Sequence, residues 1–328
     1  MDFGHAITDG IRAAVGVPAA AYALAAIGLN VQYGFTGLVN FGQVGFLLVG
    51  AYGTAITADG GAPLWLAVIV GILAAVALGI LLGIPTLRLR ADYLAIVTIS
   101  AAEILRISAN SRQLEGFTGG AFGIKGFANS FFDINPIPQG RYGIGDVSFD
   151  HRTLWIISVA WVCVILTSLL VWLLVRSPYG RMLRAIREDE DAARSLGKNA
   201  FATKLQSLVI GGVIGALGGI VIAIDAQFTN ADYWRSAFTF FTYTVLILGG
   251  VATIFGPIIG SMLFWFVFQG LDTVLRQAIT EGYFGDALNP SDTGPIRLAL
   301  VGLTLILLMV FRPQGLFGNR AEALVDEQ

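Results

Sequence analysis

Charged side chains are scarce in this sequence of 328 residues: 13% are Asp, Glu, Lys or Arg, whereas 55% are hydrophobic. An average soluble domain carries roughly 25% charged residues. A chain with so little charge lacks the polar side chains needed to cover a water-soluble globule, and its mean hydropathy of +0.74 also excludes intrinsic disorder. The composition therefore predicts a polytopic membrane protein.

Cysteine and histidine are also nearly absent. Cys163 has no second cysteine with which to form a disulfide, and His5 and His151 are too few for a His/Cys zinc site. A net charge of −2 provides no basic surface for nucleic acid. No Gly-x-x-x-x-Gly-Lys-Ser/Thr sequence occurs, so the chain cannot hold ATP phosphates in a P-loop. We expect no metal, no nucleic-acid partner and no cofactor of its own.

Stretches without charged residues set the number of membrane spans, because a helix needs about 20 apolar residues to cross the hydrocarbon layer. Residues 13–58 and 236–271 are each long enough for two helices, interrupted at Gly34–Asn40 and Gly249–Pro257. Single spans are predicted at Leu64–Thr86, Tyr93–Ala109, Thr153–Val175, Leu205–Ile224 and Pro295–Phe311. The predicted fold class is an all-α bundle of about nine transmembrane helices, within a range of eight to ten, forming one domain over residues 1–328.

Basic residues in the loops predict the orientation, because Lys and Arg accumulate on the cytoplasmic side. The connection 177–204 is rich in Arg and Lys, whereas basic and acidic residues balance in the connection 110–152. The first is therefore predicted to be cytoplasmic and the second extracytoplasmic, where its length favours a small structure of its own. Alternation of the spans then places Arg88, Arg90, Arg312 and the C-terminus at the cytoplasmic face, with the three arginines as anchors.

Glycine is abundant, with 41 residues, and several lie at four-residue spacing within the predicted spans. Gly211, Gly215 and Gly219 share one helix face, which is typical of close helix packing in membranes. Gly-interrupted apolar segments also occur in both halves of the chain, at 37–45 and 249–260. Such pairs indicate a transport site built from discontinuous helices, so Gly42, Gln43 and Gly256 are candidate pathway residues; a true internal repeat and a chance likeness both remain open.

Few ionisable residues fall within the predicted spans. Glu103 and Arg106 lie three residues apart in one span, where they form either a structural ion pair or part of the pathway. Asp225 and Asp272 stand at the ends of spans, and we expect water to solvate both.

The connection 177–204 contains a predicted amphipathic helix, Met182–Leu196, preceded by Ser177-Pro178 and ended by Gly197 as a left-handed cap. Its apolar residues form one narrow stripe: Leu183, Ile186, Ala193 and Leu196. Such a helix is expected to lie flat beneath the bundle with its stripe covered by a partner. The acidic run 188–191 would be repelled by anionic lipid, which favours a protein partner over the lipid headgroups.

The segment Asp191-Ala-Ala-Arg-Ser-Leu-Gly197 resembles the Glu-Ala-Ala-x-x-x-Gly coupling loop of ABC importer permeases, with Asp in place of Glu. Over residues 30–318 the chain resembles the branched-chain amino acid permeases of the LivM type, through the ordered segments 37–52, 87–106, 118–120, 177–199, 248–260 and 311–318. Two positions depart from that pattern: Ala91 replaces an expected Gly, and Gln43 stands where His is equally usual. The second departure bears on the choice of substrate.

This resemblance implies a non-catalytic half-pore in the plasma (inner) membrane of a prokaryote, surrounded by lipid. It implies as partners a second permease subunit of the LivH type, two ATP-binding subunits that bind the ATP, and an extracytoplasmic amino-acid-binding protein. ATP-driven closure would move the coupling loop, assigned to Arg187, Asp191, Ala192, Ala193 and Gly197. The implied substrates are leucine, isoleucine and valine, with urea or short amides as the alternative within the family.

Two other classes of transporter remain as alternatives. An ion-coupled secondary transporter would use Glu103 as its ion or proton site, although the spans contain few acids. A passive channel would need a ring of like charges or a filter sequence, and neither is visible.

Overall fold

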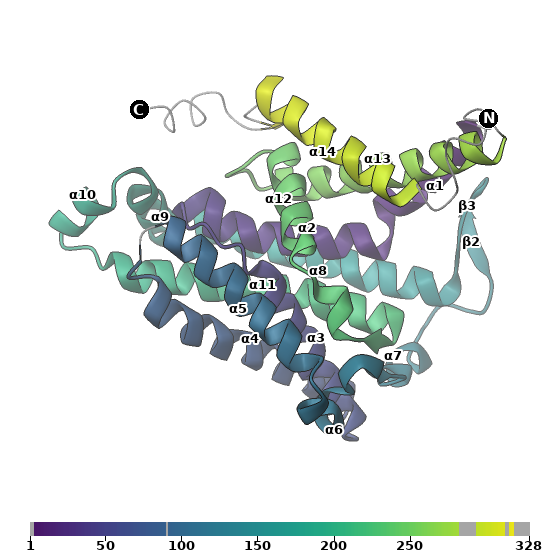
Figure 1. Cartoon of the computed structure of the whole chain (residues 1–328), viewed down its shortest axis with the longest axis horizontal. Coiled ribbons are helices and arrows are strands. Elements are labelled where there is room, and N and C mark those ends of the chain that lie inside the picture. The colour runs from purple at the N-terminus through teal and green to yellow at the C-terminus, as the bar shows by residue number, and fades with distance from the viewer. Residues whose placement is uncertain (1–2, 90, 282–292, 312–314, 318–328) are drawn as a thin grey trace.

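The computed structural model of the chain describes residues 3–89, 91–281, 293–311 and 315–317, and it is mostly helical. Long helices run roughly parallel across the molecule in Figure 1. The short helices α9 (Pro178–Glu188) and α10 (Glu190–Ser195) lie at one end, and the strands β2 (Arg141–Ile144) and β3 (Val147–Asp150) lie at the opposite end. The two predicted loops are therefore on opposite ends of the bundle.

Four described helices are long and apolar enough to cross a membrane. They are α4 (Leu64–Thr86), α8 (His151–Arg176), α11 (Ala200–Ala226) and α13 (Gly256–Thr280). Two bent pairs qualify as well: α1 (Phe3–Val15) with α2 (Val17–Leu29) and its continuation, and α5 (Ala91–Ala109) with the short turns after it. The described residues thus contain four to six candidate spans, and the number nine stays a prediction.

Polar side chains cap the starts of two of these helices. Asp150 caps α8 by accepting a hydrogen bond from the backbone N–H of Arg152, and Asn199 caps α11 through Ala202. The helix α4 has the predicted limits Leu64–Thr86. Three further apolar helices are α3 (Gln43–Asp59), α12 (Ala237–Gly249) and α14 (Thr293–Phe311).

The two predicted interruptions are real. A π-helical turn, Asn30–Gly34, extends α2, and the chain then turns before α3 begins at Gln43. Residues 250–255 separate α12 from α13 in the same way. Gly37 (φ +72°) and Gly250 (φ +118°) occupy backbone conformations that favour glycine, which fixes where each turn occurs.

The glycine face of α11 packs against two neighbouring helices. A Cβ atom at Gly211 would collide with the carbonyl of Gly28 and the side chain of Gln32. One at Gly215 would collide with the Gln43 amide, and one at Gly219 with the backbone of Leu47. The glycines therefore serve helix packing, as predicted, and two of them also make room for buried amides.

The loop 110–152 forms a small structure, but one that is not purely helical. It contains η2 (Arg112–Leu114), α6 (Glu115–Thr118), η3 (Gly120–Phe122), β1 (Ile124–Lys125), α7 (Asn129–Asp133) and the hairpin β2–β3. The strand β1 pairs with β4 (Phe228–Thr229), directly after α11 and before η4 (Ala231–Trp234). The all-α description was wrong here, because strands of two to four residues carry almost no periodic signal.

Two further features differ from the sequence-based expectations. The helix α1 was not predicted, because its charges Asp9 and Arg12 interrupt the apolar pattern; it packs along α13, where Thr273 donates a hydrogen bond to Asp9. The prediction that water solvates Asp272 was also wrong. That carboxylate is buried between Arg276 and Arg297, each 2.8 Å away, since α14 returns across α13.

Candidate functional site

Buried amide side chains gather at the first interruption. The Nδ2 of Asn40 donates to Oε1 of Gln32 (2.9 Å) and to Oε1 of Gln43 (3.2 Å). The Nε2 atoms of the two glutamines donate to backbone carbonyls of α11, Gln32 to Leu208 and Gln43 to Gly211, both at 3.1 Å. We call Asn30, Gln32, Asn40 and Gln43 the amide network; all four side chains are buried, and the hydrogen bonds between side chains join the last three.

Neighbouring helices hold this interruption through its backbone. The hydroxyl of Tyr243 in α12 lies 3.2 Å from both the N–H and the carbonyl of Asn40. The N–H of Phe41 donates to Thr98 of α5 at 3.1 Å. A Cβ atom at Gly42 would collide with the carbonyl of Thr98, so Gly42 allows the close approach of α5 rather than offering a polar group.

Asn30 joins the second interruption to the first. Its Nδ2 donates to the carbonyl of Thr253 (2.7 Å), and its Oδ1 accepts from the N–H of Ala252 (2.9 Å). Gly256 lies at the start of α13, where its N–H donates to Oγ1 of Thr253 (3.1 Å) and where a Cβ atom would collide with Thr253 and Gly250. The interruptions of the two halves of the chain are therefore in contact through the Asn30 side chain.

The predicted single helix Met182–Leu196 is two helices. Asp189 has an extended backbone (φ −155°) and accepts a hydrogen bond from the N–H of Ala192, which ends α9 and caps α10. The start at Ser177 and the stop at Gly197 (φ +75°) are both confirmed. The stop is a Schellman motif, since the N–H of Gly197 donates to Arg194 and that of Lys198 to Ala193. We call residues 177–199 the coupling region.

The apolar stripe of this region is mostly covered by the chain itself, so the expected need for a partner along its whole length was wrong. Ile186 and Ala193 pack with Ala200 at the start of α11, and Leu183 is fully buried. Leu196, in contrast, is 79% exposed, and the Asp191 side chain is 94% exposed. The surface that the chain leaves uncovered is thus the end of α10, which includes Asp191, Ala192, Leu196 and Gly197.

Arg187 connects the coupling region to the first interruption. Its Nη1 donates to the carbonyl of Gly34 at 2.7 Å, and its side-chain stem lies against Gly37. Gly34 ends the π-helical turn that begins with Asn30 of the amide network. Sequence reasoning placed Arg187 in the coupling loop but had no signal for this contact, which joins residues 153 positions apart.

The remaining predicted site residues lie elsewhere. Glu103 accepts two hydrogen bonds of 3.0 Å and one of 2.6 Å from Arg106, whose Nη1 is also 3.5 Å from Asp232. Within the part of the chain that the structure describes, Glu103 makes no hydrogen bond to the amide network. Arg88 is exposed after α4. Arg90 and Arg312 lie outside the described residues.

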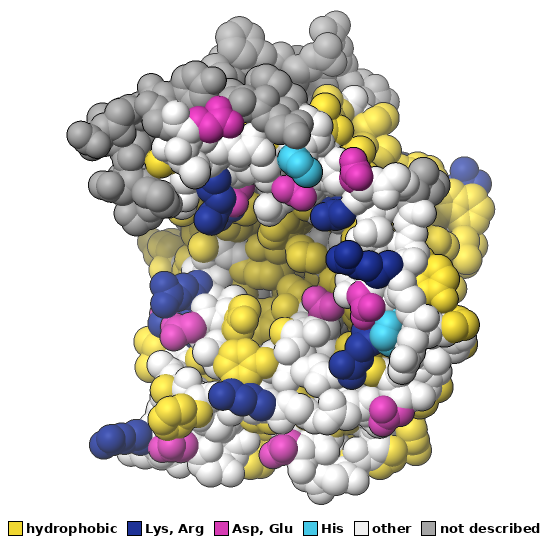
Figure 2. Space-filling model, turned by 90° about the vertical axis from the view of Figure 1, so that its right-hand side faces the viewer, with side chains coloured by type: hydrophobic (Ala, Val, Ile, Leu, Met, Phe, Trp, Pro, Cys, Tyr) yellow, Lys and Arg dark blue, Asp and Glu magenta, His cyan; other side chains and the backbone are white. Residues whose placement is uncertain are grey.

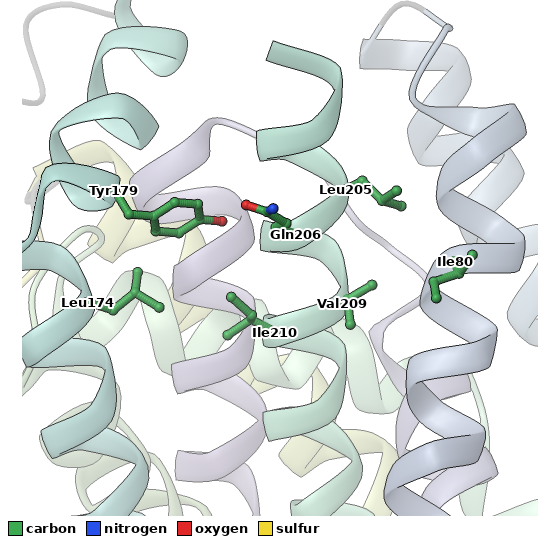
Figure 3. A pocket seen from close by; sticks show the side chains of 7 residues that line it. All are labelled: Ile80, Leu174, Tyr179, Leu205, Gln206, Val209 and Ile210. Atoms are coloured by element: carbon green, nitrogen blue, oxygen red, sulfur yellow. The ribbon is translucent and has the colours of Figure 1, made fainter. Parts of the chain in front are cut away.

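An apolar groove of about 530 Å³ opens between α4, α8 and α11 beside the coupling region (Figure 3). Its lining is Ile80, Leu174, Tyr179, Leu205, Gln206, Val209 and Ile210. Tyr179 donates to the carbonyl of Thr203 (3.4 Å), and burial raises the pKa of its hydroxyl to about 12. The groove has no charged group to bind a polar solute.

The opposite end of the molecule is hollowed. Figure 2 shows a depression with a hydrophobic floor, and side chains of both charge signs lie around it. Among the described residues, no group of three or more His, Cys, Asp or Glu side chains is placed to hold a metal ion.

Comparisons with known proteins agree on one family. The sequence model of one protein family, the branched-chain amino acid transport system permease component, matches residues 12–309. The permease protein LivM of the high-affinity branched-chain amino acid transport system of Escherichia coli (strain K12) is 31% identical over 307 residues, which are 90% of this chain and 67% of that protein.

More distant relatives include LivH of the same bacterium, 24% identical over 91% of both chains. The nucleoside ABC transporter permease protein NupC of Lactococcus lactis is 26% identical over 84% of both chains. No solved structure matches this chain. With a family match that spans most of its residues, the chain belongs to the permease components of branched-chain amino acid ABC transport systems, which are integral membrane subunits without catalytic activity of their own.

Proposed function

We propose that this subunit moves leucine, isoleucine and valine inward across the plasma (inner) membrane of a prokaryote by alternating access. It would work as a heterodimer with a LivH-type permease, driven by two ATP-binding subunits and supplied by an extracytoplasmic binding protein. ATP would be bound by those partners alone. The substrate class rests on the family and on the names of the LivM and LivH relatives. The relative NupC is named as a nucleoside permease, so relatives in this group are also named for other solutes.

The observation that carries the proposed mechanism is the hydrogen bond from Arg187 to Gly34. The coupling region offers its exposed end, Asp191, Ala192, Leu196 and Gly197, to an ATP-binding subunit. Ala193 holds that end against α11, and Arg187 passes its displacement to the turn that carries the amide network. A shift of α9 by one partner thereby reaches both interruptions.

The amide network is our candidate for the substrate pathway, through Gln43 with Gly42 and Gly256 as the points of close backbone approach. Gln43 is buried and bonded to Asn40 and Gly211 in the described state. If it lines the pathway in another state, Gln43→His should change the relative KM values for leucine, isoleucine and valine. Identical relative KM values would exclude Gln43 from the pathway.

The test of the function is reconstitution of the chain with its permease partner, ATP-binding subunits and binding protein in proteoliposomes. We expect leucine accumulation that needs ATP and the binding protein, with competition by isoleucine and valine but not by urea or acetamide. Competition by urea or acetamide alone would support the amide-transporting alternative. Leucine accumulation by the lone chain on a sodium or proton gradient would support the ion-coupled alternative, in which Glu103 would have to leave Arg106.

The proposed topology has nine spans, with residues 177–204 and the C-terminus in the cytoplasm and residues 110–152 outside. Cys163 is the single cysteine of the chain, so a Cys163→Ala background permits cysteine scanning. We expect Leu196→Cys to be labelled by an impermeant maleimide only from the cytoplasmic side and Phe122→Cys only from the outer side. Both positions are highly exposed in the structure. Labelling of both from one side would contradict the topology.

A further inference from the structure

A polar pocket of about 270 Å³ lies where α8 begins and α11 ends. This is the end of the molecule that carries β2 and β3 in Figure 1. Its lining comprises Phe132, Arg152, Thr153, Ile156, Asp225, Ala226 and Gln227. The volume is just below the roughly 300–1,000 Å³ of pockets that take drug-sized ligands, which suits a smaller solute. Unlike the apolar groove of Figure 3, this pocket contains one cationic and one anionic side chain.

Neither charge has an ion-pair partner among the described residues. The guanidinium of Arg152 lies over the Phe132 ring at 4.8 Å, and the carboxylate of Asp225 makes no hydrogen bond there. Opposite charges that line one small cavity attract each other and pair where the elements that carry them let them meet. Arg152 and Asp225 are instead held apart on two separate helices.

Both charges also stand at helix ends that disfavour them. Arg152 is in the first turn of α8, at the positive end of its dipole, and Asp225 is in the last turn of α11, at the negative end. Each placement lowers the stability of its helix rather than raising it. Gln227 adds a further unfavourable feature, since it is a non-glycine residue at φ +48°. Arg152 and Asp225 are both exposed, as expected for Asp225, so water can solvate each charge. Helix stability does not explain why the two charges line the same pocket.

The surroundings keep the pocket in place. The carbonyl of Gln227 accepts a hydrogen bond from the N–H of Gly126 (2.8 Å), next to the β1–β4 pair. On the other side, Trp155 donates to the carbonyl of Phe131 (3.1 Å) and stacks on its ring, which fixes α7 and therefore Phe132. The charges are thus presented by a braced framework and not by free loops.

From these observations we propose that the pocket between Arg152 and Asp225 binds the zwitterion of an α-amino acid. The substrate carboxylate would accept hydrogen bonds from the Arg152 guanidinium, and its ammonium would donate to the Asp225 carboxylate. Phe132 and Ile156 would contact an apolar side chain. The site would receive the solute at the outer end of the subunit, before the amide network. This inference rests on the proposed function for its substrate class.

Binding of leucine to the complete transporter in nanodiscs, without the binding protein, tests the inference. Two analogues each lack one charge: 4-methylpentanoate has no ammonium, and 3-methylbutylamine has no carboxylate. We expect each to bind about ten- to a hundredfold more weakly than leucine, the range expected for loss of one charge-assisted hydrogen bond. Asp225→Asn should weaken leucine to the level of 4-methylpentanoate, and Arg152→Gln should weaken it to the level of 3-methylbutylamine.

Matched controls are Asp133→Asn and Arg141→Gln, exposed charges of the same outer loop that do not line the pocket. Both should bind leucine as the parent does. As a second readout, leucine should slow maleimide labelling of Thr153→Cys in a Cys163→Ala background, even if a charge variant assembles poorly. Unchanged leucine affinity in Asp225→Asn and Arg152→Gln, in a complex that still transports leucine, would overturn this site alone. A parent complex that transports no leucine would overturn the proposed function and this inference together.

Discussion

Replacement of Arg187 by methionine tests how the coupling region acts on the bundle. Methionine keeps an unbranched apolar stem beside Gly37 but removes the donor that bonds the Gly34 carbonyl at 2.7 Å. A hydrogen bond from a charged donor is worth about 1.5–3 kcal/mol net. Since about 1.4 kcal/mol changes an equilibrium tenfold, the loss amounts to roughly ten- to a hundredfold in the balance between two states that differ in this bond.

The assay is the ratio of leucine accumulated to ATP hydrolysed by the reconstituted transporter. We expect Arg187→Met to keep ATP hydrolysis and to lose most of the accumulation, because α9 then moves without the turn at Gly34. Arg187→Lys should give a ratio between those of the parent and of Arg187→Met, because its ammonium can donate to a carbonyl but lacks the planar fork of arginine.

Arg181→Met is the matched control, because Arg181 is on the same helix, is exposed, and its side chain makes no hydrogen bond or ion pair among the described residues. It should behave as the parent does. An unchanged ratio of leucine accumulated to ATP hydrolysed in Arg187→Met would refute the reasoning. The hydrogen bond from Arg187 to Gly34 would then not differ between the states of the transport cycle.

Three further predictions follow from packing and burial. Gly211→Ala and Gly215→Ala should each destabilise the subunit by about 1–3 kcal/mol, because the new methyl group collides with the Gly28 carbonyl and Gln32 in the first variant and with Gln43 in the second. Both variants should have a lower Tm than Gly302→Ala, whose methyl group would enter open space. Ala193→Glu should lower the Tm of the isolated subunit, since Ala193 is buried, whereas the exposed Leu196→Glu should leave that Tm unchanged and reduce co-purification of the ATP-binding subunits. Burial raises the pKa of Tyr179 from 10 to about 12, so the folded state resists its ionisation. The stability difference between the parent and Tyr179→Phe should therefore be constant below pH 10 and shift against the parent as the pH rises from 10 to 12; a constant difference throughout would show that the hydroxyl is accessible.

Charge-free stretches predicted the helices well, because a chain in lipid must bond its backbone within each segment and can place few charges there. The limits of α4 and the two interruptions follow from that rule together with the conformational demands of Gly37 and Gly250. The bounds of the coupling region follow equally from local chemistry, since a Ser-Pro start and a glycine stop act within a few residues.

What the sequence could not predict depends on contacts between distant residues. The break at Asp189 interrupts a run of good helix formers, and it is accompanied by the packing of Ile186 and Ala193 on Ala200, which no local pattern specifies. The amide network joins lone polar residues, each of which looks like a minor exception within an apolar run. The ion pair of Asp272 with Arg297 likewise needs the return of α14, which no local pattern specifies.

The helix α11 joins the two ends of the subunit without a break. At Ala200 it packs on Ile186 and Ala193 of the coupling region, and one residue beyond Gln227 the chain pairs with β1 of the loop 110–152. A helix of 27 residues is roughly 40 Å long, which exceeds the thickness of the hydrocarbon layer. A continuous helix of this length, with contacts at both ends, links movements of the two ends. In the proposed transporter, docking of a solute-loaded protein at one end and nucleotide exchange at the other would therefore act on the two ends of this one helix.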